Sequence, residues 1–501
     1  NGGLFASDEA DHVGQVYLAN DLFDPNSEQG LLHFLNRFNF TIEEDTPLES
    51  QVALDPEMLG KVFENLLEVE ERGKSGTFYT PRAVVAFMCR EALSAYLSHA
   101  VAELDADHLG WLLDEAEMGE PARDEQTHER LTYRNLSFDM HEAIERALRA
   151  VRVLDPAVGS GAFPLGMLAL MVGVRRALYR IRENAIEPHA RLLEDWKRAY
   201  IRDCLYGVDI RQEAIEIARL RLWLSLVVDA DPFTMEPLPN LDYKLMGGDS
   251  LIETLDGVEI YPTHPAGALA QVSLLGDEER HELIARLKAL QTRYFQPGDG
   301  DDRARLKRDI RATETRLVEA TLGDRERDER TRLEANLHKQ ANLRGATVLR
   351  ELVTEQVTLT RSIEATEATK ADLAAGKPLP FFLYRLHFAS VFEEQGGFDI
   401  VIANPPYVRH EKIAPATLTA LKAAYPGVAH GMADLYTYFY ARALDLLRAG
   451  GSLCFISSNK FFRTGYGKKL RETLASETSV RVVIDFGDFP VFDAAAYPCI
   501  V

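Results

Sequence analysis

The chain has 501 residues, of which 46% are hydrophobic, and its formal net charge at pH 7 is −22. This much apolar sequence suffices for more than one hydrophobic core, and no unbroken apolar run reaches the length of a membrane span. The negative charge argues against a protein that grips DNA with its whole surface, although a local basic groove is compatible with it. The four cysteines, Cys89, Cys204, Cys454 and Cys499, lack C-x-x-C spacing, so we expect reduced thiols, no metal site and a cytoplasmic protein.

The two ends of the sequence lead us to expect a piece of a longer protein. It begins at Asn1 rather than at Met, and its last residues, AYPCIV, read as the middle of a strand. Residues 1–50 are polar and weakly periodic, and we treat them as an N-terminal flank. Residues 51–150 are predicted to form a helical segment, because EMLGKVFENLL and PRAVVAFMCREALSAYL are helical patterns, with GTFYTP between them.

Strands and helices then alternate in a way that predicts an α/β fold. Over residues 151–265, VRVLDPAVGSGAF, CLYGVDI and YKLMGGDSL are three strand patterns with helical patterns between them, which is typical of a parallel, helix-covered, Rossmann-like sheet. Over residues 266–385, apolar residues recur every three or four positions in a charged sequence, which predicts an inserted helical, coiled-coil-like arm. The alternation resumes over residues 386–501, so we expect one sheet interrupted by an insertion.

The first strand runs into a glycine-rich turn. Asp155 and Pro156 end the strand, and Gly159 and Gly161 lie in the turn before the next helix. Glycines there let a ligand approach the backbone, and free N–H groups at a helix start favour negative charge. The turn lacks the third glycine of the dinucleotide-binding pattern, so it does not by itself identify the ligand.

Acidic residues end three successive strands. Asp155, Asp209 and Asp249 each follow an apolar run. Any one of them alone is readily explained as a helix cap, but the carboxyl ends of parallel strands meet at one edge of a sheet, where ligands bind. We therefore expect Asp209 to accept the hydroxyls of a ribose and Asp249 to accept from an adenine amino group.

The fourth strand, FDIVIA, runs into Asn404, Pro405, Pro406 and Tyr407. Two prolines cannot donate to a ladder, so the strand stops in a stiff turn. The amine of a nucleobase is a poor nucleophile, and acceptors for both of its N–H groups draw the nitrogen toward tetrahedral geometry. The Asn404 side chain and the Pro405 carbonyl are such acceptors, and Tyr407 can stack on a base that has left its duplex, for about 1–3 kcal/mol.

Together these motifs resemble the amino-group DNA methyltransferases of the N6-adenine type, in the gamma order where cofactor motifs precede the catalytic one. The nearest resemblance is to methylases of type IIG restriction–modification and BREX-like phage-defence systems, over roughly residues 55–501. It implies S-adenosyl-L-methionine as the cofactor. The implied cofactor-binding residues are Tyr79, Thr80, Asp155, Pro156, Gly159, Gly161, Asp209, Ile210, Asp249, Ser250 and Asn404.

The resemblance also implies the partners. The substrate is expected to be double-stranded DNA with the target adenine flipped out, in the cytoplasm of a bacterium or archaeon and without a membrane. Phe492 in DFPVFDAA is expected to stack on that base together with Tyr407. The helical insertion is a candidate contact for other subunits of a defence complex. A target-recognition domain and a nuclease motif are not visible in this sequence.

Three alternatives stay open. N4-cytosine methyltransferases more often have Ser in place of Asn404, and protein-glutamine methyltransferases are shorter and lack the helical insertion. A silent scaffold that binds partners through the arm is the third, and it predicts loss of catalytic residues that are present here. Cys499 is interpreted as a buried strand cysteine and not as the nucleophile of a 5-cytosine methylase.

Overall fold

The computed structural model describes residues 39–41, 51–53, 80–118, 136–183, 187–227, 239–255, 258–259, 277–295, 300–342, 346–375, 382–492 and 497–501. Strands β1 (Asn39–Thr41) and β2 (Gln51–Ala53) form a short parallel pair. The helix predicted around EMLGKVFENLL and Tyr79 of GTFYTP lie outside the described residues.

The main sheet has seven strands in the order β10-β11-β9-β8-β3-β4-β5. All pairs from β9 to β5 are parallel. This confirms the predicted α/β fold. The strands are β3 (Val153–Asp155), β4 (Leu205–Asp209), β5 (Leu245–Gly247), β8 (Phe398–Ala403), β9 (Leu447–Ser458), β10 (Ile484–Asp485) and β11 (Pro498–Ile500).

The strand order reverses direction at β3. The chain moves outward from β3 to β4 and β5, then returns to place β8 on the other side of β3, followed by β9. In an open α/β sheet such a reversal leaves a crevice at the carboxyl ends of the strands on either side of it. Asp155 ends β3 and Asn404 follows β8, so the topology brings these residues to the crevice.

The sheet is mixed at one edge, whereas the sequence pattern predicts a parallel sheet. β11 is antiparallel to β9, and β10 is antiparallel to β11. A short return between β10 and β11 explains the difference, because antiparallel neighbours need no crossover helix.

Helices cover both faces of the sheet, which explains why FDIVIA is buried along its whole length. Ile400 and Ile402 pack with α4 and α7, while Val401 and Ala403 pack with α15 and α16. The helices of the body are α4 (Arg82–Ala100), α5 (Ala106–Met118), α6 (Phe138–Ala150), α7 (Ala162–Arg182), α8 (Ala190–Asp203), α9 (Gln212–Val227), α13 (Tyr384–His387), α14 (Ala389–Gln395), α15 (Pro415–Ala424), α16 (Leu435–Leu446) and α17 (Lys468–Glu477).

Helix α7 differs from the sequence-based expectation that no segment is long and apolar enough to span a membrane. Within the described residues it alone has the length and composition of a span, but 61% of its apolar window is buried inside the protein. It packs against α4 and α5 and against the sheet, as a core helix does.

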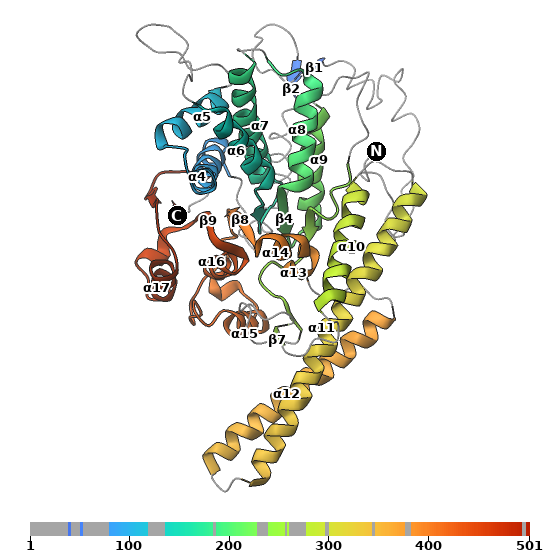
Figure 1. Cartoon of the computed structure of the whole chain (residues 1–501). Helices are drawn as coiled ribbons and strands as arrows, with labels where there is room; N and C mark the ends of the chain where they lie inside the picture. Colours follow the sequence, from blue (N-terminus) through green and yellow to red (C-terminus); the bar gives the residue numbers. More distant parts are fainter. Residues whose placement is uncertain are drawn as a thin grey trace, which may run out of the picture.

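The predicted arm is a long helical hairpin. Helices α11 (Gly300–Asn342) and α12 (Ala346–Ala374) run side by side and extend away from the α/β body, with α10 (Asp277–Phe295) along the first part of α11 (Figure 1). A small apolar core joins the base of the arm to the body. In it Leu287 and Ile310 pack with Leu383 and Leu386, which lie at the return of the chain to the sheet.

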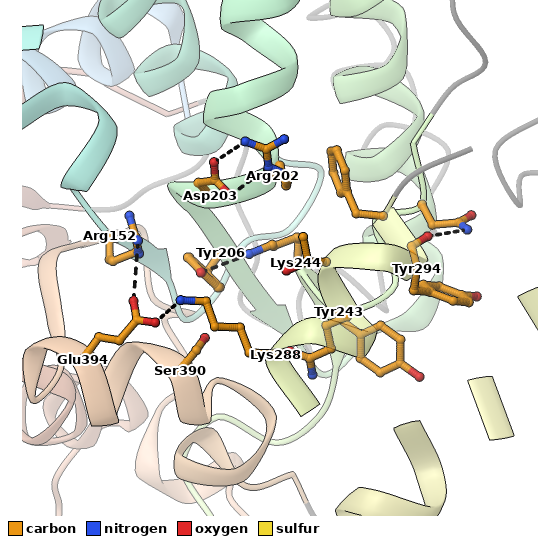
Figure 2. A pocket seen from close by; sticks show the side chains of 14 residues that line it. Arg152, Arg202, Asp203, Tyr206, Tyr243, Lys244, Lys288, Tyr294, Ser390 and Glu394 are labelled. Carbon is orange, nitrogen blue, oxygen red and sulfur yellow. Dashed lines mark hydrogen bonds and ion pairs between the residues drawn. The ribbon is translucent and has the colours of Figure 1, made fainter. Parts of the chain in front are cut away.

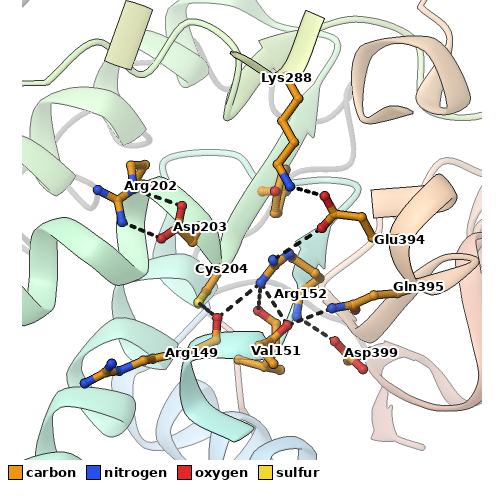
Figure 3. A network of polar contacts seen from close by, with 12 residues as sticks. Arg149, Val151, Arg152, Arg202, Asp203, Cys204, Lys288, Glu394, Gln395 and Asp399 are labelled. Atoms are coloured by element: carbon orange, nitrogen blue, oxygen red, sulfur yellow. Dashed lines mark hydrogen bonds and ion pairs between the residues drawn. The ribbon is translucent and has the colours of Figure 1, made fainter. Parts of the chain in front are cut away.

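A polar network fixes the same junction at the amino ends of the strands (Figure 3). Lys288 of α10 pairs with Glu394 of α14, which also lies 4.0 Å from Arg152. The backbone N–H of Arg152 donates to Asp399 Oδ2 at 2.7 Å, which links the starts of β3 and β8. Both apolar and charged contacts therefore fix the base of the arm to the body near the amino ends of the strands.

Glu314 is a buried acid in the base of the arm. Its side chain is 8% exposed, and its Oε1 has no hydrogen-bond partner among the described residues. Burial raises the pKa of Glu314 to about 7, against a smaller opposing effect of Arg311. The protonated form is therefore favoured in the folded protein. The stability this provides is fully present below the unfolded pKa and is lost as pH rises toward and past 7.

We expect Glu314→Gln to stabilise the protein at pH 8 relative to the wild type, because the amide needs no proton to stay neutral. The difference in unfolding free energy should grow between pH 5 and pH 8, up to about 3 kcal/mol. Urea unfolding of both proteins across that range measures it. The exposed Glu319→Gln is the matched control on the same helix and should show no such trend. Parallel pH profiles for Glu314→Gln and the wild type would contradict the expectation.

Candidate functional site

A cavity of about 310 Å³ lies at the carboxyl ends of β3, β4, β5 and β8. Most of the predicted site residues meet there although they come from five separate segments. The predicted residues that line it are Thr80, Asp155, Pro156, Gly159, Asp209, Ile210, Asp249, Ser250, Asn404 and Pro406. Gly161, Pro405, Tyr407 and Phe492 lie outside this lining, and Tyr79 falls outside the described residues.

A second pocket at the opposite edge of the sheet is much smaller, about 60 Å³ (Figure 2). Its charged groups are engaged with one another. Arg202 pairs with Asp203 at 2.7 Å, and Lys244 donates to the Tyr206 hydroxyl at 3.0 Å. The larger cavity is therefore the candidate functional site.

The glycine-rich turn forms one wall. Gly159 and Gly161 have φ angles of +50° and +86°, a region that L side chains rarely adopt. A Cβ on Gly161 would lie 2.9 Å from the Cβ of Ala218 on α9. Gly161 thus allows close packing of α7 on α9, a role that differs from the predicted cofactor contact.

Asp155 is buried with one oxygen available to the cavity. Its Oδ1 accepts from the N–H of Ala157 at 3.0 Å, and Oδ2 has no hydrogen-bond partner among the described residues. Burial raises the pKa of Asp155 well above its ordinary value, and the Asp209 carboxylate adds to the rise. A ligand that brings a positive charge or a hydrogen-bond donor to Oδ2 would stabilise the ionised carboxylate and lower its pKa again.

Asp209 and Asp249 are held by backbone N–H groups. Asp209 accepts from Gly159 at 2.9 Å and from Arg211 at 2.9 Å, and Asp249 Oδ1 accepts from Leu251 at 2.8 Å. Both acids therefore stabilise turns, and both line the cavity. Each carboxylate oxygen can accept more than one hydrogen bond, so both acids can still accept hydrogen bonds from a ligand while they bind the backbone N–H groups.

Ile210 supplies an apolar surface beside these acids. Its side chain is 74% exposed although it lines the cavity.

The NPPY turn and the FYTP segment meet at the cavity. Asn404 Nδ2 donates to Thr80 Oγ1 at 3.1 Å, across 324 positions of sequence. Pro405 is buried under the turn, and Pro406 lines the cavity. The hydrogen bond orients the Asn404 amide at the carboxyl end of β8.

Tyr407 and Phe492, the two predicted base-stacking residues, are in contact. Their ring centroids are 6.0 Å apart, and their planes meet at 82°. Tyr407 also meets Tyr436 of α16 edge to face. The rings lie next to the cavity but do not form a parallel slot in this conformation.

Two helices contribute further lining residues. Thr417 and Leu421 of α15 and Leu435 and Phe439 of α16 all line the cavity. Each pair is four residues apart and so lies on one helix face. In the sequence, ADLYTYF resembles the cofactor-contacting helix of the amino-group DNA methyltransferases and so predicts a role for α16, whereas α15 has no motif and sequence reasoning missed its two residues.

Ser250 is held by a buried polar network. Its hydroxyl donates to the Pro156 carbonyl at 2.6 Å and accepts from Tyr384 at 3.0 Å. Arg442 of α16 forms a buried ion pair with Glu253 at 2.6 Å, and Glu253 also accepts from the N–H of Tyr384. This network fixes the loop after β5, so Ser250 supports the wall while its hydroxyl is already engaged.

Thiol and metal chemistry find no support in the described residues. The four cysteines are free and buried, and burial raises the pKa of Cys499 to about 12, so its thiolate is suppressed. Within the described ranges, no group of three or more His, Cys, Asp or Glu side chains is arranged to hold a metal ion.

A sheet that reverses at β3, a glycine-rich turn and acids at successive strand ends define the class of S-adenosylmethionine-dependent methyltransferases. Comparison with protein families identifies the class more narrowly. The sequence pattern of the Eco57I restriction-modification methylases matches residues 203–492, which is more than half of the chain. The chain belongs to this family.

The chain is similar to several known proteins. It is 25% identical over 528 aligned residues to a putative type II restriction enzyme and methyltransferase of Methanocaldococcus jannaschii, covering 99% of this chain and 41% of that protein. The type II methyltransferase M.PaeR7I of Pseudomonas aeruginosa is 39% identical over 21% of this chain and 19% of its own length. The chain thus spans less than half of these relatives.

A solved structure of the type IIL restriction-modification enzyme MmeI in complex with DNA covers 90% of this chain and 40% of its own, at 12% identity. Its TM-score is 0.39, which is too low to support an argument about the site.

The cavity fits the cofactor that this class uses. S-adenosylmethionine carries a positive charge. Three carboxylates line the cavity, and the buried Asp155 Oδ2 has no hydrogen-bond partner in the described part of the chain, so the site suits a cationic ligand. The exposed Ile210 offers an apolar surface to an adenine ring. A volume of about 310 Å³ is within the range of small-molecule pockets.

We expect Asp209→Ala to weaken binding of S-adenosylmethionine on the order of 10- to 100-fold, the loss for hydrogen bonds to a charged group. Isothermal titration calorimetry measures the affinity. Glu213→Ala removes a nearby exposed acid on α9 and is the control. Unchanged affinity in Asp209→Ala would remove the ribose assignment.

Proposed function

We propose that the chain is the methyltransferase part of a restriction–modification enzyme that methylates N6 of an adenine flipped out of double-stranded DNA. The observation that carries the proposal is the position of Asn404, which follows β8 directly, lines the cavity and is oriented by Thr80. Family membership supports DNA methylation, and the NPPY turn supports an amine as the acceptor.

In the proposed mechanism the residues of the turn bind and orient the adenine amine. The Asn404 side-chain carbonyl and the Pro405 backbone carbonyl accept its two N–H groups, which moves the nitrogen lone pair out of conjugation with the ring. The cofactor, when bound, supplies a methyl group on a positively charged sulfur. No covalent intermediate with the protein is needed, since the amine nitrogen would take the methyl group as the bond from the methyl carbon to sulfur breaks, and the nitrogen would then lose one of its protons to solvent.

Base capture is assigned to Tyr407 and Phe492. The two rings touch at 82°, so a base stacked on both requires them to become parallel. Tyr407 follows β8 directly and meets Tyr436 edge to face, whereas Phe492 belongs to the connection between β10 and β11. We therefore assign the movement to Phe492, which would leave its place in the main core. Stacking then offsets part of the cost of removing the base from the duplex.

The proposal extends to location and partners. A reaction that needs DNA and this cofactor fits the cytoplasm of a bacterium or archaeon. The outer half of the arm exposes Leu349, Val353 and Val357 at intervals of four on α12, an apolar line that fits contact with another subunit or domain of a defence complex.

The overall test is mass spectrometry of nucleosides from DNA treated with the full-length protein and S-adenosylmethionine. The proposal expects N6-methyladenine. N4-methylcytosine would support the cytosine alternative, and no modified nucleoside would support a scaffold or a protein substrate.

We expect Asn404→Ala to lower the single-turnover methylation rate of the full-length protein by at least 100- to 1000-fold, roughly the loss for a group that binds mainly the transition state. Cofactor affinity should stay within a few-fold. Gln395→Ala removes a side-chain amide at the opposite ends of the strands, where it donates to the Ala150 carbonyl, and is the control. If Asn404→Ala weakens cofactor binding by as large a factor as it lowers the rate, Asn404 binds the cofactor and not the target adenine.

We expect Tyr407→Phe to retain most activity, since stacking uses the ring face, and Tyr407→Ala to lose it through poor capture of the base. A mismatch at the target adenine should partly restore Tyr407→Ala, because unpairing then costs less. Single-turnover rates on matched and mismatched duplexes measure both effects. Equal losses for Phe and Ala would mean that the hydroxyl or the fold, and not stacking, explains the role of Tyr407.

A further inference from the structure

The turn between β10 and β11 contains three phenylalanines at intervals of three, and they differ in burial. Phe486 packs against the main core, and Phe492 is 7% exposed and in contact with Tyr407. Phe489 between them is 66% exposed. Single exposed apolar residues are ordinary on protein surfaces, so exposure alone decides nothing.

The backbone holds Phe489 in a defined position. Its N–H donates to the Phe486 carbonyl at 3.0 Å, and its own carbonyl accepts from Val491 at 2.9 Å. Gly487 has a φ of +55°, and its N–H donates to Asp485 Oδ1 at 3.0 Å. Phe489 therefore stands on a hydrogen-bonded turn, three residues from the ring assigned to the flipped base.

The neighbouring segment is basic. Residues 446–471, which span β9, the connection after it and the start of α17, contain six Arg or Lys and no Asp or Glu, in a chain of net charge −22. Lys460 and Arg463 lie in the connection after β9, and Asn459 Nδ2 of the same connection donates to Asp485 Oδ1 at 2.7 Å, which joins it to the Phe489 turn. Within the described residues Lys460 and Arg463 have no carboxylate at ion-pair distance; Arg463 is still near enough to Asp485 to add to the lowering of its pKa, after the hydrogen bonds from Asn459 and Gly487. An aromatic ring beside cations at the catalytic edge matches the chemistry of a duplex, with stacked bases between phosphates.

We propose that Phe489 enters the DNA duplex and fills the space that the flipped adenine leaves, with Lys460 and Arg463 contacting the adjacent phosphates. This proposal rests on the proposed function. It assigns Phe489 a positioning role, because it touches the duplex and not the reacting atoms. Stacking of its ring on the base pairs beside the gap replaces contacts that the flipped base gives up.

The test is single-turnover methylation by the full-length protein with Phe489→Ala and Phe489→Leu. Phe489→Ala should be at least tenfold slower than the wild type on a matched duplex, and within twofold of it on single-stranded DNA, where there is no gap to fill. Phe489→Leu should lie between. The exposed Val483→Ala, which precedes β10, is the matched control and should behave as the wild type.

Each other outcome overturns the proposal in a distinct way. If Phe489→Ala methylates the matched duplex at the wild-type rate, Phe489 has no role in flipping the adenine. A second outcome is that Phe489→Ala slows methylation equally on duplex and single-stranded DNA, and a third is that it lowers the melting temperature of the protein while the ratio of the two rates stays unchanged. Either result means that Phe489 supports the fold or is covered by another part of the protein. If the wild type methylates no DNA, the proposed function fails first, and this inference fails with it.

Discussion

The pairing of β3 with β8 is the constraint on which the rest of the structure depends. Val153 lies opposite Ile400 and Leu154 opposite Val401, and Asp399 accepts from the N–H of Arg152 across 247 positions of sequence. This pairing brings the strand that ends at Asp155 next to the strand that precedes Asn404. Without it, the acids of one half and the amide of the other would have no common cavity.

The long insertion between β5 and β8 is compatible with this pairing for two physical reasons. Closing a loop costs only about 0.6 kcal/mol more for each doubling of its length, so a large insertion adds little entropy cost. The inserted helices also share an apolar core with Leu383 and Leu386, where the chain returns to the body, and next to these residues Glu253 and Arg442 form a buried ion pair. The base of the arm is thus fixed to the body, and its return is fixed to the cavity wall.

Much of the fold and the site could be predicted from sequence, because local signals carry them. Asp155, Asp209 and Asp249 each follow an apolar strand, and NPPY stops a strand by simple backbone chemistry. The contribution of α15 could not be predicted, since Thr417 and Leu421 reach the cavity through the path of the chain and not through a motif. Ser250 and Gly161 are expected at the site, but their structural roles could not be predicted, because their partners Tyr384 and Ala218 are distant in sequence.

The hairpin of α11 and α12 has a consequence for how the enzyme can be divided. The acids that line the cavity precede α11, whereas Asn404, Tyr407 and Phe492 follow α12. A cut between the two helices gives one fragment with Asp155, Asp209 and Asp249 and another with Asn404, and neither contains the complete cavity. Because α11 and α12 pack along their length, the helices themselves form the pairing element that reunites the fragments. The arm is therefore a natural place to make assembly of the cavity depend on the meeting of two separate chains.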